Sequence, residues 1–115
     1  MNKDFQRIYS QLHYWGLASS QYDFSQRWLG QCSSYYSSMM ARNAQPGIEA
    51  ILSLLARLRS HDEKLKSTDA ARTNPQMAQL QCMLQREADA LAEHLYDASL
   101  QRVAQRHSNQ LEANP

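Results

Sequence analysis

The side chains that most often perform catalysis or hold metals are scattered in this sequence. Its four histidines lie far apart, and none has a second metal-ligand side chain four residues away on a helix face: His13, His61, His94 and His107. The densest group is Glu93, His94 and Asp97, but one histidine with two carboxylates is more typical of a solvated helix face than of a metal site. With no glycine-rich phosphate loop and no nucleophile elbow, the sequence predicts no catalytic residue, metal, cofactor or small-molecule substrate. We therefore expect a protein that is not an enzyme.

Residues 33–42 indicate a different chemistry. Here two pairs of serines flank two tyrosines, and the segment ends at an arginine. Short polar side chains allow a helix backbone to approach DNA closely, and an arginine can bind a phosphate or the edge of a guanine. The residues predicted to contact DNA from this face are Ser33, Ser34, Tyr35, Ser37, Ser38 and Arg42. The alternative is an ordinary serine-rich surface helix of a small bundle, which would show the same apolar spacing.

Two short helices are needed to present this face. Phe24, Trp28 and Leu29 recur on one helix face, Ser20 can serve as the N-cap, and Gly30 can end the helix in the left-handed conformation. A second helix is predicted from about residue 34 to 43, and its Tyr36 side chain points inward. This order predicts a helix-turn-helix. In the usual pattern of that motif the small residue and the turn glycine are four positions apart, whereas Ser25 and Gly30 are five apart.

Helices are also expected on both sides of this unit. Residues 4–15 carry apolar side chains at steps of three and four, and residues 48–59 show the strongest such stripe in the chain. Arg57 and Arg59 near the end of the second stripe either touch the DNA backbone or only complement the helix dipole. The residues predicted to contact DNA outside the serine-rich face are Arg27, Gln31, Arg57 and Arg59.

The phrases YDFSQRWLG, SSYYSSMMARN and PGIEAILSLLARL carry a family resemblance that covers roughly residues 5–60. This part of the chain resembles small helix-turn-helix proteins of bacterial plasmids and prophages. It is similar to plasmid-stabilisation proteins of StbA type and, more distantly, to lambda-repressor-like domains. The resemblance implies binding of repeated operator or segregation sites on double-stranded DNA, with repression of the protein's own promoter. By position it transfers the recognition role to the serine-rich face.

Composition and charge set the class of the whole chain. The 115 residues include only 3 Gly and 3 Pro, which favours an all-α protein, and 20% are charged. The net charge is +1, but residues 1–60 carry six basic against three acidic residues, and residues 61–115 carry six against eight. The positive half thus contains the predicted DNA-binding face. Because no apolar run reaches the roughly 20 residues of a membrane span, we expect a cytoplasmic protein associated with the nucleoid or a plasmid. Cys32 and Cys82 are expected to be free, buried thiols.

The second half of the chain is predicted to mediate self-association. We expect a helix-turn-helix domain over 1–60, a linker over 61–74, a long helix over 75–106 and a disordered tail over 107–115. The apolar stripe of the long helix is predicted to form a homodimer through Met77, Leu80, Leu84, Leu91 and Leu95. It could instead fold back on the N-terminal core or bind another protein. An alternative function therefore remains: a helical interaction adaptor or inhibitor, similar to an antitoxin.

Overall fold

The described part of the chain is built from helices alone. The computed structural model describes the fold of residues 1–113 and the side chains of residues 1–69, 71–97, 101 and 104. Its elements are α1 (Asn2–Tyr14), α2 (Gln21–Asp23), the π-helical turn η1 (Phe24–Trp28), α3 (Tyr35–Ala41), α4 (Ile48–Ser67), α5 (Ala70–Thr73) and α6 (Pro75–Ala113). The predicted all-α class is confirmed.

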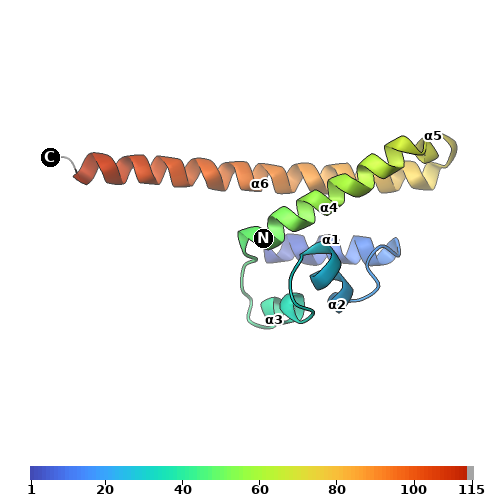
Figure 1. Cartoon of the computed structure of the whole chain (residues 1–115), viewed down its shortest axis with the longest axis horizontal. Coiled ribbons are helices and arrows are strands. Elements are labelled where there is room, and N and C mark those ends of the chain that lie inside the picture. The colour runs from blue at the N-terminus through green and yellow to red at the C-terminus, as the bar shows by residue number, and fades with distance from the viewer. Residues whose placement is uncertain (114–115) are drawn as a thin grey trace.

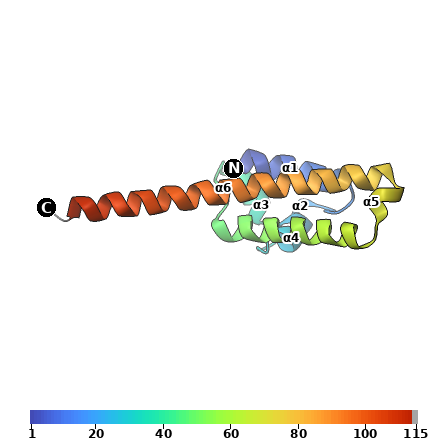
Figure 2. The ribbon, with the colours of Figure 1, turned by 90° about the horizontal axis from the view of Figure 1, so that it is seen from above.

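The two longest helices organise the molecule. α4 and α6 form a helical hairpin that turns at α5, and α1 to α3 pack together on one side of it (Figure 1). Viewed from above, α6 runs beside α1 and then continues well past the other helices (Figure 2). This projection makes the molecule elongated, with principal extents of 64 × 32 × 18 Å.

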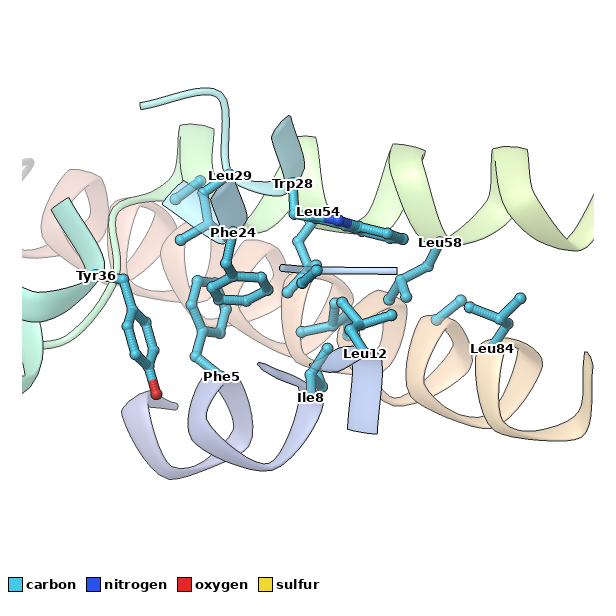
Figure 3. Packing of buried hydrophobic residues seen from close by; sticks show 14 of the residues in the cluster. Phe5, Ile8, Leu12, Phe24, Trp28, Leu29, Tyr36, Leu54, Leu58 and Leu84 are labelled. Carbon is cyan, nitrogen blue, oxygen red and sulfur yellow. The ribbon is translucent and has the colours of Figure 1, made fainter. Parts of the chain in front are cut away.

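One hydrophobic core joins all the long elements. Phe5, Ile8 and Leu12 of α1 are fully buried because steps of three and four place them on one face. Phe24, in η1, contacts the rings of Phe5 and Tyr36 edge-on (Figure 3). The other buried hydrophobic residues of this cluster come from η1, α3, α4, α6 and the segments that follow α1 and η1: Ala18, Trp28, Leu29, Met39, Ala50, Leu54, Leu58, Leu80, Met83, Leu84, Ala88 and Leu91.

The predicted linker over residues 61–74 is wrong along most of its length. α4 continues without a break to Ser67, because Asp62 and Leu65 lie on the same face as Leu58 and extend its contact with α6. Asp62 is almost buried, and its carboxylate accepts a hydrogen bond from Gln85 at 3.2 Å and pairs with Lys66 at 3.3 Å. Satisfied in this way, a polar residue does not interrupt the buried face.

The predicted dimer stripe lies inside a single chain. Leu80, Leu84 and Leu91 are buried against the chain's own core, and Met77 is partly buried against it, so the fold-back alternative holds for this half of α6. Leu95 is partly buried as well. The leucines cannot form a dimer interface without leaving the core.

Two smaller predictions also need correction. α6 extends to Ala113, so residues 107–113, predicted as disordered, are helical, while residues 114–115 lie outside the described range. The start of this helix at Pro75 is as predicted, since the Asn74 side chain caps it by accepting a hydrogen bond from the Gln76 N–H at 2.9 Å. Cys32 and Cys82 are free, but both are exposed rather than buried.

Candidate nucleic-acid interface

The first short helical segment begins at a reciprocal cap. The Ser20 hydroxyl accepts a hydrogen bond from the Asp23 N–H at 3.1 Å, and the Asp23 carboxylate accepts one from the Ser19 N–H at 2.9 Å. The Ser20 side chain thus satisfies a backbone donor that the first helical turn leaves free, and the Asp23 side chain satisfies the N–H of the residue before the cap. The predicted N-cap at Ser20 is confirmed, and the cap fixes the direction in which α2 leaves α1.

The same segment ends in a π turn. The Leu29 N–H donates to the Phe24 carbonyl at 3.0 Å, five residues earlier, where an α-helix would use a carbonyl four residues earlier. A π turn holds one more residue than an α turn. It therefore accommodates the extra position between Ser25 and Gly30 that the sequence shows.

Gly30 turns the chain toward α3 and contacts α4. Its φ of +64° is in the left-handed region, and a Cβ atom there would lie 3.1 Å from the Ser53 hydroxyl oxygen. That hydroxyl donates to the Trp28 carbonyl at 3.0 Å, which fastens the end of η1 to α4. The left-handed backbone conformation favours glycine here, and the close approach of the Ser53 side chain adds to that preference.

Ser25 joins the two short segments through one buried hydroxyl. The side chain is fully buried, donates to the Gln21 carbonyl at 2.9 Å, and accepts from the Tyr36 N–H at 3.0 Å. Tyr36 is in the first turn of α3, where backbone N–H groups have no partner within the helix, and α3 has no side-chain cap of its own. Ser25 therefore replaces that cap across the turn and fixes α3 against α2 and η1.

Half of the predicted DNA contacts lie on α3 or at its two ends. Ser34, Ser38 and Arg42 are exposed, while the neighbouring Tyr36 and Met39 point into the core. The remaining members of the set are half-buried: Gln31, Ser33, Tyr35 and Ser37. The structure thus brings together the serine-rich set that the sequence indicates.

Some of these side chains are engaged within the chain. The Tyr35 hydroxyl accepts a hydrogen bond from the Gly47 N–H at 3.0 Å, so it braces the connection between α3 and α4. The Ser37 hydroxyl donates to the Ser34 carbonyl at 3.1 Å, and the Arg42 guanidinium donates to the Ser38 carbonyl at 3.3 Å. The Ser34 hydroxyl lies 3.7 Å from the Cys32 sulfur, within hydrogen-bond distance, and Ser38 is exposed.

The three predicted arginines outside α3 do not form one group. Arg27 pairs with Asp23 at 3.3 Å along its own segment, and Arg59 faces α6, where it lies 3.9 Å from Asp89. Arg57 is exposed and makes no ion pair with the described residues. Arg57 is therefore the one of the three whose guanidinium is not held by a carboxylate of the described residues.

His61 was not predicted as a site residue, and three basic side chains act electrostatically on it. Its ring stacks on Trp28 with 4.8 Å between ring centroids. Burial lowers the pKa of His61, and the charges of Lys64, Arg27 and Arg57 lower it further. Steps of three from Leu58 to His61 and Lys64 along α4 were the available signal for this grouping.

Two searches of the described residues for other kinds of site gave no candidate. Across residues 1–97, where side chains are described throughout except for Ala70, no three His, Cys, Asp or Glu side chains are arranged to hold a metal ion. Among the helices of residues 1–113, none combines the length and apolar character of a membrane span.

The fold and this surface define a small all-α protein in which two consecutive short helical segments share a buried hydroxyl and rest on a long helical hairpin. Over residues 5–111 the chain matches the family of unknown function DUF6626, and it belongs to that family. Comparison with curated proteins and with solved structures gives no match.

Proposed function

We propose that this chain is a sequence-specific double-stranded DNA-binding protein that reads bases with α3. Ser25 is the observation that carries the proposal. Its hydroxyl holds α3 at a fixed position on α2 and η1, while the opposite face of α3 presents Ser34, Ser38 and Arg42. A rigid support under a short, polar, exposed helix is what base recognition in the major groove requires.

The π turn supports the same proposal. The departure from the usual helix-turn-helix spacing is one residue, and η1 holds that residue without moving Ser25 off the buried face. The resemblance to small plasmid and prophage proteins then suggests the biological role. We propose that the protein acts as a transcriptional (auto)repressor, a plasmid stability or segregation factor, or both, on repeated sites.

Side chains are assigned by their exposure and by the element that they face. Arg42, Ser34 and Ser38 are proposed to touch bases, since each is exposed on α3 or at one of its ends. Arg27 and Arg57 are proposed to contact phosphates, which position a protein on the duplex without reading sequence. Tyr35 is assigned to bracing and Arg59 to the contact between α4 and α6.

A gel shift tests the proposal directly. The full chain is titrated onto the DNA just upstream of its own gene and onto random duplex of equal length, at two salt concentrations. We expect retention of the upstream DNA at protein concentrations that leave random duplex free, and a loss of affinity as salt rises, because phosphate contacts release counterions.

Matched arginine variants make the test specific. Arg42→Ala should weaken binding, whereas Arg72→Ala, an exposed arginine on α5 paired with Asp69, should leave it unchanged. If neither duplex is retained at low salt, the proposal is wrong. Equal losses in the two variants would show a general charge effect without a reading helix.

The projection of α6 favours a second function. Beyond its contact with α1 and α4, this helix continues past the other helices (Figures 1 and 2). A protruding helix suits a protein-interaction adaptor or inhibitor, similar to an antitoxin. That function predicts no affinity for random DNA at low salt, together with stable complex formation with a protein partner.

A further inference from the structure

A cavity of about 360 Å³ lies near the α5 end of the α4–α6 hairpin. It is lined by the segment after α1 and by both long helices: Trp15, Leu17, His61, Lys64, Leu65, Thr68, Met77, Leu80 and Leu84. In Figure 2 this is the end of the hairpin farthest from the projecting part of α6. The volume falls in the range of sites that hold small organic molecules, about 300–1,000 Å³.

The lining is apolar except at one side. Leu80 and Leu84 form a fully or nearly fully buried wall, and Trp15, Leu65 and Met77 are partly buried around it. The Trp15 indole N–H is the one hydrogen-bonding group among these five side chains, and the hydroxyl of Thr68, which also lines the cavity, donates to the Leu65 carbonyl at 3.1 Å. An occupant must therefore have an apolar body.

The charge at the edge of the cavity has one sign. His61 and Lys64 line it, no carboxylate does, and Lys64 makes no ion pair with the described residues. Lys64 is thus the charged side chain that lines the edge of this apolar cavity, and the occupant should carry a negative charge at one end.

We propose that this cavity binds a small organic monocarboxylate, with its apolar chain between α4 and α6 and its carboxylate at Lys64. No small-molecule substrate is expected from the sequence, and this ligand is held without reacting. Its binding is separate from DNA binding, since none of the residues proposed to contact DNA lines the cavity.

The test uses three probes with the same chain and different ends: octanoate, 1-octanol and octyltrimethylammonium, each below its micelle-forming concentration. Trp15 lines the cavity and Trp28 stacks on His61, so tryptophan fluorescence of the full chain reports occupancy. A shift in melting temperature with probe concentration gives an independent measure, because a ligand bound to the folded state stabilises it. We expect saturable binding of octanoate and none of the cation.

Variants separate the charge from the cavity. Lys64→Met should weaken octanoate binding about fivefold, the size expected for one partly exposed charge pair, and leave 1-octanol binding unchanged. Lys3→Met, an exposed lysine on α1 that does not line the cavity, is the matched control. Met77→Trp should fill the cavity and abolish binding of both probes, whereas Met40→Trp, on α3, should not.

Several outcomes would overturn the proposal. If no probe binds to a folded chain, the cavity takes no ligand of this class. Equal binding of all three probes would show unspecific adsorption, and equal losses in Lys64→Met and Lys3→Met would show a long-range charge effect. Melting curves of each variant without probe establish that it is folded.

Discussion

Glu87 is the acidic side chain that ties α6 to α1. It is 3% exposed and accepts hydrogen bonds from the Arg7 guanidinium at 2.8 Å and from Gln11 at 3.3 Å. Its hydrogen bond raises the pKa of Arg7. We predict that Arg7→Met lowers the free energy of unfolding by about 2 kcal/mol, since it leaves a buried carboxylate without its main donor.

Urea unfolding followed by circular dichroism measures that loss. Arg86→Met is the control, because Arg86 lies 3.7 Å from the same carboxylate but is mostly exposed. Its loss should stay below about 1 kcal/mol, as for other surface ion pairs. Equal losses in the two variants would show that Arg7 stabilises the buried Glu87 carboxylate no more than Arg86 does.

His61 predicts a dependence of stability on pH. Burial and the charges of Lys64, Arg27 and Arg57 lower its folded-state pKa, so the unfolded chain takes up this proton first as the pH falls below about 6.5. The stability should therefore decline as the pH falls from about 6.5 to the folded-state pKa of His61. Well above pH 6.5, this group does not change the stability. The pKa of Asp4 lies below its ordinary value. Burial raises this pKa, but the hydrogen bond from Arg7 and the nearby positive charges lower it by more.

The measurement is urea unfolding as a function of pH in the wild type and in His61→Phe, which keeps an aromatic ring on Trp28 and cannot titrate. We expect the decline just below pH 6.5 to shrink in the variant. An unchanged pH profile would mean that another group causes the decline.

Arg42 distinguishes base reading from phosphate binding. If it reads a base, Arg42→Ala should cost about 1 to 3 kcal/mol of binding free energy on the specific site and relax the preference at one position. The competition of single-base variants of the site in a gel shift measures this preference. A loss that is uniform across all sequences would make Arg42 a phosphate contact instead.

At the scale of elements, α3 depends on a cap supplied from another segment. We predict that Ser25→Ala lowers the free energy of unfolding by about 1 to 3 kcal/mol, because the buried Tyr36 N–H would lose its acceptor. Ser38→Ala, an exposed serine on α3, is the matched control and should change stability little. Urea unfolding and hydrogen exchange at the Tyr36 amide measure the effect, and full protection of that amide in Ser25→Ala would contradict it.

Local signals predicted most element boundaries. Ser20, Gly30 and the Asn74–Pro75 pair mark real ends because capping depends on a few neighbouring residues. The π turn could not be predicted, since it depends on how Trp28 and Leu29 pack against α4. Likewise, Asp62 interrupts the apolar pattern of the sequence, but in the fold its buried carboxylate accepts a hydrogen bond from Gln85 of α6. The sequence pattern of α4 alone does not show this partner.

At the scale of the whole molecule, the sequence predicted the all-α class but not what covers the leucines of α6. A stripe at helical spacing shows that a face is buried and does not name its partner. The serine-rich face on α3 was predictable because it is local. The basic group at His61 was predictable only in part, since the spacing of His61 and Lys64 along α4 shows in the sequence but their approach to Arg27 of η1 does not.

The place of α6 in the core predicts how the chain tolerates shortening. Leu80 to Leu91 complete the core, so removal of residues 75–115 should abolish cooperative unfolding. Removal of residues 98–115 takes away the part that projects beyond the body and should leave the melting temperature within a few degrees (Figure 1). Thermal melts of both truncations check this, and a folded 1–74 fragment would contradict it.

The same arrangement has a consequence during synthesis. The apolar face of α4 is made well before the part of α6 that covers it, so a nascent chain exposes Leu54 and Leu58 until Leu91 has left the ribosome. Folding of the core must then wait for a late segment, and an interrupted translation product should be a substrate for chaperones and proteases. The order in which the helices are made thus makes the core depend on a segment that is synthesised after α4.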